Sequence, residues 1–243
     1  MTGALHALQG LLAAARLPQA KPSGRVRTTK ITASEPPSTW WPGGAVSTEA
    51  GERMPLTKIA VARAQLVTAL DMFVRDKDPI SIQCLACGGG EIVEGLAEAH
   101  GEEPFAMHIL KDQPYMDRKA IRRKRNQYWN AFKHFFDLKG LPREDEDLLA
   151  QFSDINNDVA LFVGWWDYMT VQKRLPVAAQ VFQVWWYALN EGKLSPDADF
   201  EVIRTAFPDI VQQSRAEQKR RLRRSIEKYR RDKALLADPA TET

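Results

Sequence analysis

The sequence predicts an all-α fold: a bundle of about six helices with a disordered N-terminal segment and a basic C-terminal helix. Three observations support this prediction. After Met54 the apolar residues recur at three- and four-residue steps. Strand-like alternation of apolar and polar residues is nearly absent. Hydrophobic residues make up 44% of the chain and charged residues 27%, with seven Trp and ten Phe to fill a core.

Residues 1–53 differ from the rest of the chain. They hold five of the fourteen prolines and six of the fourteen glycines, with no sustained helical period after about Arg16. Such a segment buries too little apolar surface to offset the entropy lost on ordering, so we expect disorder. Its first turns, LHALQGLLAAARL, are amphipathic and acid-free, which is typical of an organelle transit peptide. The alternative is that Met54 is the natural start and the residues before it are a mis-assigned extension.

The bundle domain is expected over residues 54–207, with a basic helix and tail over 208–243. The first helix covers 57–76, and Asp78 followed by Pro79 is an N-cap signal for a second helix that ends near Gly101. Gly88–Gly90 lie inside this second helix and cost it roughly 2–3 kcal/mol relative to alanines. They therefore mark either a break or a surface that a neighbouring helix approaches closely.

The remaining helices follow from the same period. Pro104 and Pro114 bound a loop or a short helix. We expect further helices over 117–137, 155–173, 177–190, 197–206 and about 208–236.

The expected helix over 117–137 carries the candidate site. On a wheel of 100° per residue, its aromatic and apolar residues share one face: Ile121, Tyr128, Trp129, Phe132, Phe135 and Phe136. Its polar residues share the opposite face: Arg123, Asn126, Asn130, Lys133, His134 and Asp137. Arg125 falls among the aromatics, where its guanidinium must reach water, stack on a ring or find a carboxylate.

The polar face allows two interpretations. In the first, His134 is a general acid or base, Asn130, Arg125 and Arg123 complete a catalytic site, and Lys133 helps to hold a phosphate. In the second, these residues are the solvated side of an ordinary amphipathic helix. Two asparagines inside a helix are unusual, because Asn is a poor helix former, and they indicate buried hydrogen bonds or a ligand.

Three segments, DPISIQCLA (78–86), NAFKHFFD (130–137) and INNDVALFVGWWDYM (155–169), carry a resemblance to a bacterial family of all-helical proteins that has no assigned activity. The pair Arg125-Asn126 followed by His134 is also similar to the signature of the HEPN superfamily of ribonucleases and RNA-binding bundles. That resemblance implies metal-independent cleavage of RNA and a homodimer, in which two protomers bring their copies of the helix together.

The two cysteines, Cys84 and Cys87, do not form a zinc or redox motif, because no second CxxC follows and His100 and His108 are too far apart for a finger. We expect both to be small buried residues and predict no metal or cofactor. No signal peptide is recognisable, and no apolar run approaches the ~20 residues of a transmembrane helix. A cytoplasmic location is the expectation.

Two further groups of residues are predicted to be structural. The pairs Trp165-Trp166 and Trp185-Trp186 are expected in the core, with a base-stacking platform as the alternative. Asp154 and Asp158 are expected to cap the start of a helix.

The strongest charge signal is the C-terminal segment. Residues 214–233 contain ten Lys or Arg and three acids, so this segment carries +7 and the other residues together carry −4. The candidate nucleic-acid ligands are Arg220, Arg221, Arg223, Arg224, Arg230 and Arg231. A helix of this kind can bind RNA or DNA, an anionic membrane surface, or the acidic loop at 143–147. The sequence therefore favours an RNA-interacting protein with HEPN-like ribonuclease activity; the alternative is a non-enzymatic scaffold or regulator that binds another protein.

Overall fold

The computed structural model describes residues 56–113, 115–196 and 198–242. The interpretations of residues 1–53 as a disordered, transit-like or mis-assigned segment lie outside the described residues. Within them the fold is helical, which confirms the predicted class, but eleven α-helices are present where about six were expected. The excess arises because the predicted long helices are interrupted and short helices fill the connections.

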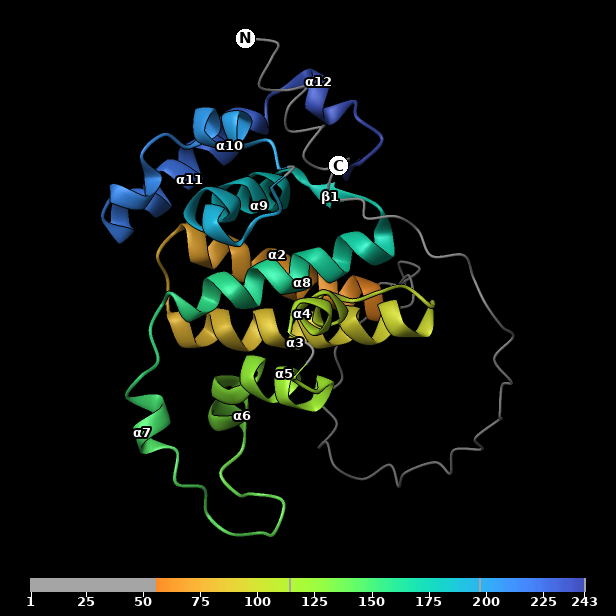
Figure 1. Ribbon diagram of the computed structural model, residues 1–243, viewed down its shortest axis with the longest axis vertical. Coiled ribbons are helices and arrows are strands. Elements are labelled where there is room, and N and C mark those ends of the chain that lie inside the picture. The colour runs from red at the N-terminus through yellow and green to blue at the C-terminus, as the bar shows by residue number, and fades with distance from the viewer. Residues whose placement is uncertain (1–55, 114, 197, 243) are drawn as a thin grey trace, which may run out of the picture.

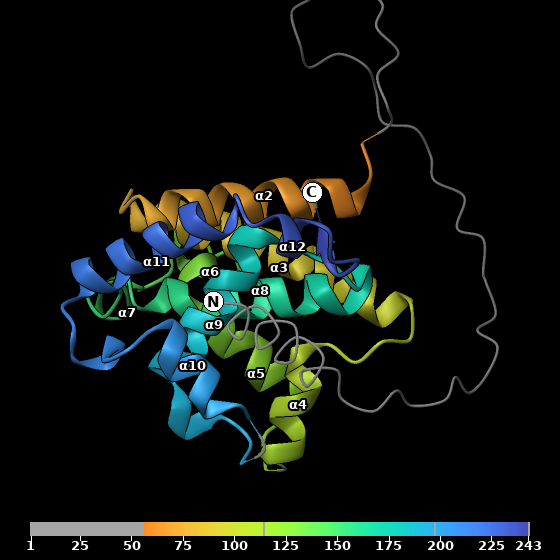
Figure 2. The same cartoon turned by 90° about the horizontal axis from the view of Figure 1, so that it is seen from above.

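The centre of the molecule is formed by helices α2 (Lys58–Val74), α3 (Pro79–Ala99), α8 (Asn156–Gln172) and α9 (Val177–Leu189). Figure 1 shows α3 and α8 side by side, with α2 behind them. Below α3 in Figure 1 lie α5 (Arg118–Arg125), α6 (Gln127–Lys133) and α7 (Glu146–Leu149), and α4 (Phe105–Asp112) lies in front of α3 and α8, on the side of α8 away from α2 (Figure 2). On the opposite side from α5 and α6 lie α10 (Phe200–Ala206), α11 (Arg215–Tyr229) and α12 (Lys233–Leu236).

Short elements complete the chain path. Two 3₁₀ turns, η1 (Glu191–Lys193) and η2 (Ile210–Gln212), flank α10. Strands β1 (Leu175–Pro176) and β2 (Thr241–Glu242) pair in parallel, with Leu175 opposite Thr241. This pairing fixes the end of the described chain beside the start of α9.

The predicted start of α3 is confirmed, because the carboxylate of Asp78 accepts a hydrogen bond from the Ser81 N–H at 2.8 Å and Pro79 is the first helical residue. Gly88–Gly90 do not break α3. A Cβ on Gly89 would lie 2.9 Å from Leu66 in α2, and a Cβ on Gly90 would lie 3.6 Å from the Cα of Gly164 in α8. The glycines therefore serve close helix approach, which was the second of the two expectations.

Aromatic side chains from α2, α8 and α9 fill the core. Trp165 and Trp185 are fully buried, and the ring of Trp186 stacks on that of Phe162 with centroids 3.8 Å apart. The structural interpretation of the tryptophan pairs is confirmed.

The helix expected over 117–137 is wrong as one element. It divides at Asn126, which is the C-cap of α5 and the N-cap of α6, and α6 ends at Lys133. His134 has extended backbone, and the next residues form a hairpin in which Phe136 bridges to Pro142. Phe135 and Phe136 are 71% and 57% exposed, so they do not belong to the buried aromatic face.

The last predicted helix is also shorter than expected. Instead of running over about 208–236, α11 begins at Arg215, where the Ser214 hydroxyl caps it, and ends at Tyr229. Leu222, Ile226 and Tyr229 form an apolar stripe that is buried against the body of the protein, where α11 contacts α9 and α2. The basic helix is thus packed onto the helices of the central layer.

Candidate functional site

The structure does not bring the predicted catalytic residues into one site. Arg125 turns inward and donates from Nη2 to the carboxylate of Glu94 in α3 at 2.6 Å. His134 lies exposed just beyond α6, and its ring has no hydrogen bond or ion pair to any described residue. Arg123 is exposed and Asn130 is half-buried. Lys133 lies over the ring of Trp129, with Nζ 3.3 Å from the centroid.

The asparagine signal has a local explanation. Asn126 is 4% exposed and sits at the break between α5 and α6, where its side-chain oxygen accepts a hydrogen bond from Nε of Arg125 at 3.0 Å. One of the two unusual asparagines therefore satisfies a buried guanidinium, which is the hydrogen-bonding alternative that the sequence left open.

Arg125 belongs to a cluster centred on a carboxylate that is fully buried. Glu94 is 0% exposed, and its Oε1 lies 3.4 Å from Nη2 of Arg122 and 3.7 Å from Nη2 of Arg118. Arg118 also pairs with Glu98, one turn further along α3. Three arginines of α5 thus face two acids of α3, and this cluster, here called the α3–α5 cluster, joins the two helices.

Asp167 of α8 lies close to the same charges. Its Oδ1 accepts the N–H of Phe105 at 2.6 Å, which fixes the start of α4, while Oδ2 has no hydrogen-bond partner among the described residues. Burial raises the pKa of Asp167 to about 7, although Arg125 and Arg118 act in the opposite direction. A buried carboxyl of this kind is a common feature of functional sites, but structural ion networks produce it too.

Sequence reasoning did not predict that either acid lies among the arginines of α5. The signal for Glu94 was present, because the buried polar residues Gln83, Cys87 and Glu94 share the inner stripe of α3 with Ala86, Gly90 and Ala97 at steps of three and four. Asp167 gives a weaker signal, since nearly every residue around it in α8 is buried and no stripe distinguishes it.

A second buried ion cluster holds α11, and it will be called the α8–α11 cluster. Lys219 is 2% exposed and donates to Asp76 at 2.8 Å and to Asp154 at 2.7 Å. Arg215 pairs with Asp154 and Asp158. Asp158 lies in the first turn of α8, as predicted for a residue at the helix start, but neither Asp154 nor Asp158 makes a side-chain cap hydrogen bond there. Their carboxylates instead form ion pairs with two cations of the C-terminal segment, Arg215 and Lys219.

The other cations of the C-terminal segment remain at the surface. Arg220 and Arg221 pair with Glu217, and Arg221 also donates to the carbonyl of Pro208. Four more basic residues are exposed, with no ion pair to a described residue: Arg223, Arg224, Arg230 and Arg231. Together with Arg220 they form an exposed set of cations, here called the α11 basic face.

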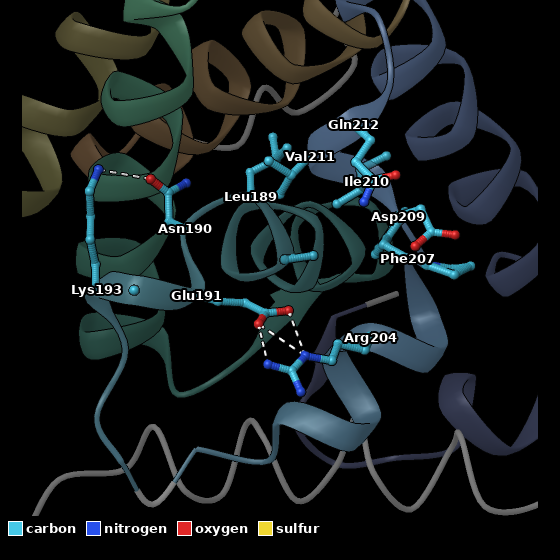
Figure 3. Close-up of a pocket in the computed structure, with 13 residues that line it drawn as sticks. Leu189, Asn190, Glu191, Lys193, Arg204, Phe207, Asp209, Ile210, Val211 and Gln212 are labelled. Carbon is cyan, nitrogen blue, oxygen red and sulfur yellow. Dashed lines mark hydrogen bonds and ion pairs between the residues drawn. The ribbon is translucent and has the colours of Figure 1, made fainter.

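Figure 3 shows a surface hollow of about 710 Å³ between the end of α9 and the η2 turn. Among its polar side chains, Arg204 binds Glu191 through two nitrogens and Lys193 donates to Asn190. The hollow is wide and open to solvent, and it contains none of the predicted catalytic residues.

Within the part of the chain that the structure describes, no group of three or more His, Cys, Asp or Glu side chains is placed to hold a metal ion. Cys87 is buried, which raises the pKa of its thiol to about 12, and Cys84 is half-buried. None of the described helices has the length and apolar character needed to cross a membrane.

Comparison with protein-family models, curated proteins and solved structures gives no match for this chain. The interpretation of its function therefore rests on the geometry above.

Proposed function

We propose that this protein binds RNA or another nucleic acid through the α11 basic face. The observation that carries the proposal is that the cations of the C-terminal segment fall into two groups, one buried in ion pairs and one exposed. Arg215 and Lys219 anchor the helix inward, whereas Arg223, Arg224, Arg230 and Arg231 are held outward without acidic partners among the described residues.

A rigid array of this kind suits a phosphate backbone. Leu222, Ile226 and Tyr229 fix the rotation of the helix by burying one side of it, so the exposed arginines keep their spacing. Positioned cations bind nucleic acid chiefly by releasing condensed counterions, and such binding weakens steeply as salt increases. Arginine also forms paired hydrogen bonds with phosphate oxygens.

The test compares two charge-matched triple variants by fluorescence anisotropy with a single-stranded RNA. In R220Q/R223Q/R224Q we expect binding to weaken and the slope of log K against log salt to become shallower by about 2, since each lost contact to a single strand contributes roughly 0.7. K58Q/K119Q/K124Q removes the same charge from exposed positions outside α11 and should change binding little. Equal effects of the two triples would show that net charge alone governs retention.

Catalysis is a separate question. Arg125 is committed to Glu94 within its own chain, so a HEPN-like centre would need a second protomer to bring a further cation to His134. Cleavage of RNA by the purified protein in a chelator, lost in His134→Ala, would establish the metal-independent nuclease. Intact RNA would leave binding as the function. Analytical ultracentrifugation of the purified protein tests whether it forms a homodimer. We also propose that the protein acts in the cytoplasm.

A second candidate is binding of another protein, and the hairpin between α6 and α7 favours it. This segment extends away from the bundle in Figure 1 and exposes Phe135, Phe136, Leu138 and Leu141 by 57% or more. Clustered exposed apolar side chains are typical of protein-binding surfaces. Salt-insensitive co-purification of one partner, lost in F135S/F136S, would support this function over the first.

A further inference from the structure

The arrangement of the cations on α11 indicates which form of nucleic acid the helix binds. Leu222 and Ile226 are buried beneath the helix, so its opposite side faces solvent. At 100° per residue, Arg224, Lys228 and Arg231 lie within ~60° of one another on that solvent side. All three are exposed and have no ion pair to a described residue. These three residues are here called the α11 ridge.

The length of the α11 ridge matches the charge spacing of a paired strand. Arg224 and Arg231 are separated by seven positions, which correspond to ~10 Å along a helix that rises 1.5 Å per residue. Each strand of a duplex carries one charge per ~3.4 Å of the duplex axis, so the ridge runs past about three phosphates and offers one cation for each. Arg220 lies one turn before Arg224, but Glu217 pairs with it.

A second observation is that α11 exposes no aromatic ring among its described residues. Proteins that bind single strands combine cations with aromatic side chains on which unpaired bases stack. Tyr229 is buried, and the Nζ of Lys228 lies 5.0 Å from its ring centroid. The large aromatic side chains that are exposed in the described part of the chain are Tyr115, Phe135 and Phe136. They belong to the segments next to α5 and α6, which Figure 1 shows on the opposite side of the central helices from α11.

Given the nucleic-acid binding proposed above, we infer that the α11 ridge binds double-stranded nucleic acid through the phosphates of one strand. A duplex is stiff over lengths far greater than this helix, so it meets only the outward ridge. A flexible single strand can bend around α11 and also reach Arg223 and Arg230, which are exposed on its flanks. The two forms therefore differ in the arginines that they contact.

The experiment titrates the full chain with a short RNA duplex, a DNA duplex of the same sequence and the single RNA strand, by fluorescence anisotropy. We expect at least one duplex to bind about 10-fold more tightly than the strand, because its phosphates are already held in line with the ridge. The tighter of the two duplexes identifies whether paired RNA or paired DNA is the ligand.

Two charge-matched double variants locate the contact. R224Q/K228Q should weaken duplex binding about 10-fold and make the slope of log K against log salt shallower by about 2, since each contact to a duplex contributes roughly 0.9. R223Q/R230Q removes the same charge from the flanks and should weaken duplex binding by less than about 3-fold. All four positions are exposed, and unchanged circular dichroism confirms that each variant is folded.

An affinity for the strand that equals or exceeds that for both duplexes would overturn the inference, and so would equal weakening of duplex binding by the two variants. Either result would leave nucleic-acid binding by the α11 basic face in place. Failure of the strand and of both duplexes to bind would instead remove the proposed function itself.

Discussion

The α3–α5 and α8–α11 clusters attach opposite layers of the molecule to the same core, and they do so with different completeness. In the α8–α11 cluster each cation has at least two acidic contacts: Lys219 binds Asp76 and Asp154, and Arg215 binds Asp154 and Asp158. In the α3–α5 cluster Arg118 and Arg122 each contact Glu94 and Glu98, but the more buried Arg125 contacts Glu94 alone, and Oε1 of Glu94 accepts no hydrogen bond from a described residue.

The apolar support differs as well. Helix α11 buries Leu222, Ile226 and Tyr229 besides its ions, whereas α5 buries Ile121 alone. Because apolar burial stabilises without demanding exact geometry, α11 should stay attached when its charges are altered. The attachment of α5 should depend on Glu94. We therefore expect changes of charge to affect the attachment of α4, α5 and α6 more than that of α11.

Glu94→Gln should have the largest effect on stability. Removing the charge leaves Arg125, with 11% of its side chain exposed, without its closest carboxylate, and breaking a buried pair in this way costs about 3–5 kcal/mol. Urea denaturation measures the free energy of unfolding. Hydrogen exchange should show loss of protection in α5 and α6 ahead of α2 and α3.

Two comparisons sharpen that experiment. Glu98→Gln removes a partly exposed acid of the same cluster and should cost less than about 1 kcal/mol. Adding Arg125→Met to Glu94→Gln should recover part of the loss, because the uncompensated charge is then gone. A double variant as unstable as Glu94→Gln would mean that the cost comes from packing and not from the unpaired guanidinium.

Asp167→Asn should change the pH dependence of stability. The pKa of Asp167 is raised to about 7 by burial, against about 3.9 in an unfolded chain, so the folded state holds the proton more tightly. The contribution of this group to stability is full below pH 4 and is lost as the pH rises to about 7. Glu94, Arg118 and Arg125 are the charged groups that act on it.

The variant should therefore match the wild type near pH 4 and exceed it by about 2–4 kcal/mol at pH 8, since one pKa unit corresponds to about 1.4 kcal/mol. Burial also raises the pKa of Asp158, to about 6, so the relevant quantity is the difference between variant and wild type at each pH. If the difference in unfolding free energy between the variant and the wild type stays constant from pH 4 to 8, the raised pKa of Asp167 is contradicted.

Helix α8 contributes Asp158 to the α8–α11 cluster and carries Asp167 near the charges of the α3–α5 cluster, and Gly164 lies between these two acids. Gly164→Ala would place a Cβ 2.6 Å from Leu66, which is fully buried, so we expect a loss of about 1–3 kcal/mol. Gly90→Ala, whose Cβ would meet its nearest neighbour at 3.6 Å, should be neutral or stabilising by up to about 1 kcal/mol. Thermal unfolding distinguishes the two, and similar shifts would contradict the packing.

The features that the sequence predicted correctly are those that depend on neighbouring residues in the chain. Asp78-Pro79, the close approach at the glycines and the burial of Trp165 and Trp185 follow from caps, periodicity and side-chain size. The prediction from sequence was wrong where contacts between distant segments determine the structure. The bend at Asn126 depends on Arg125 reaching Glu94, which is 31 residues earlier in the chain. No periodic pattern encodes such a contact, so the helix was predicted to continue and Phe135 and Phe136 were placed on its aromatic face.

Lys219→Met gives the smallest expected effect and tests the α8–α11 cluster. Methionine keeps the apolar stem against the ring of Phe73, over which the lysine Nζ lies at 4.5 Å from the centroid. Asp76, with 71% of its side chain exposed, stays hydrated, and Asp154 keeps Arg215. We therefore expect a change of less than about 1 kcal/mol in urea denaturation, with α11 still protected from exchange. A loss comparable to that of Glu94→Gln would mean that α11, like α5, is held mainly by its charges.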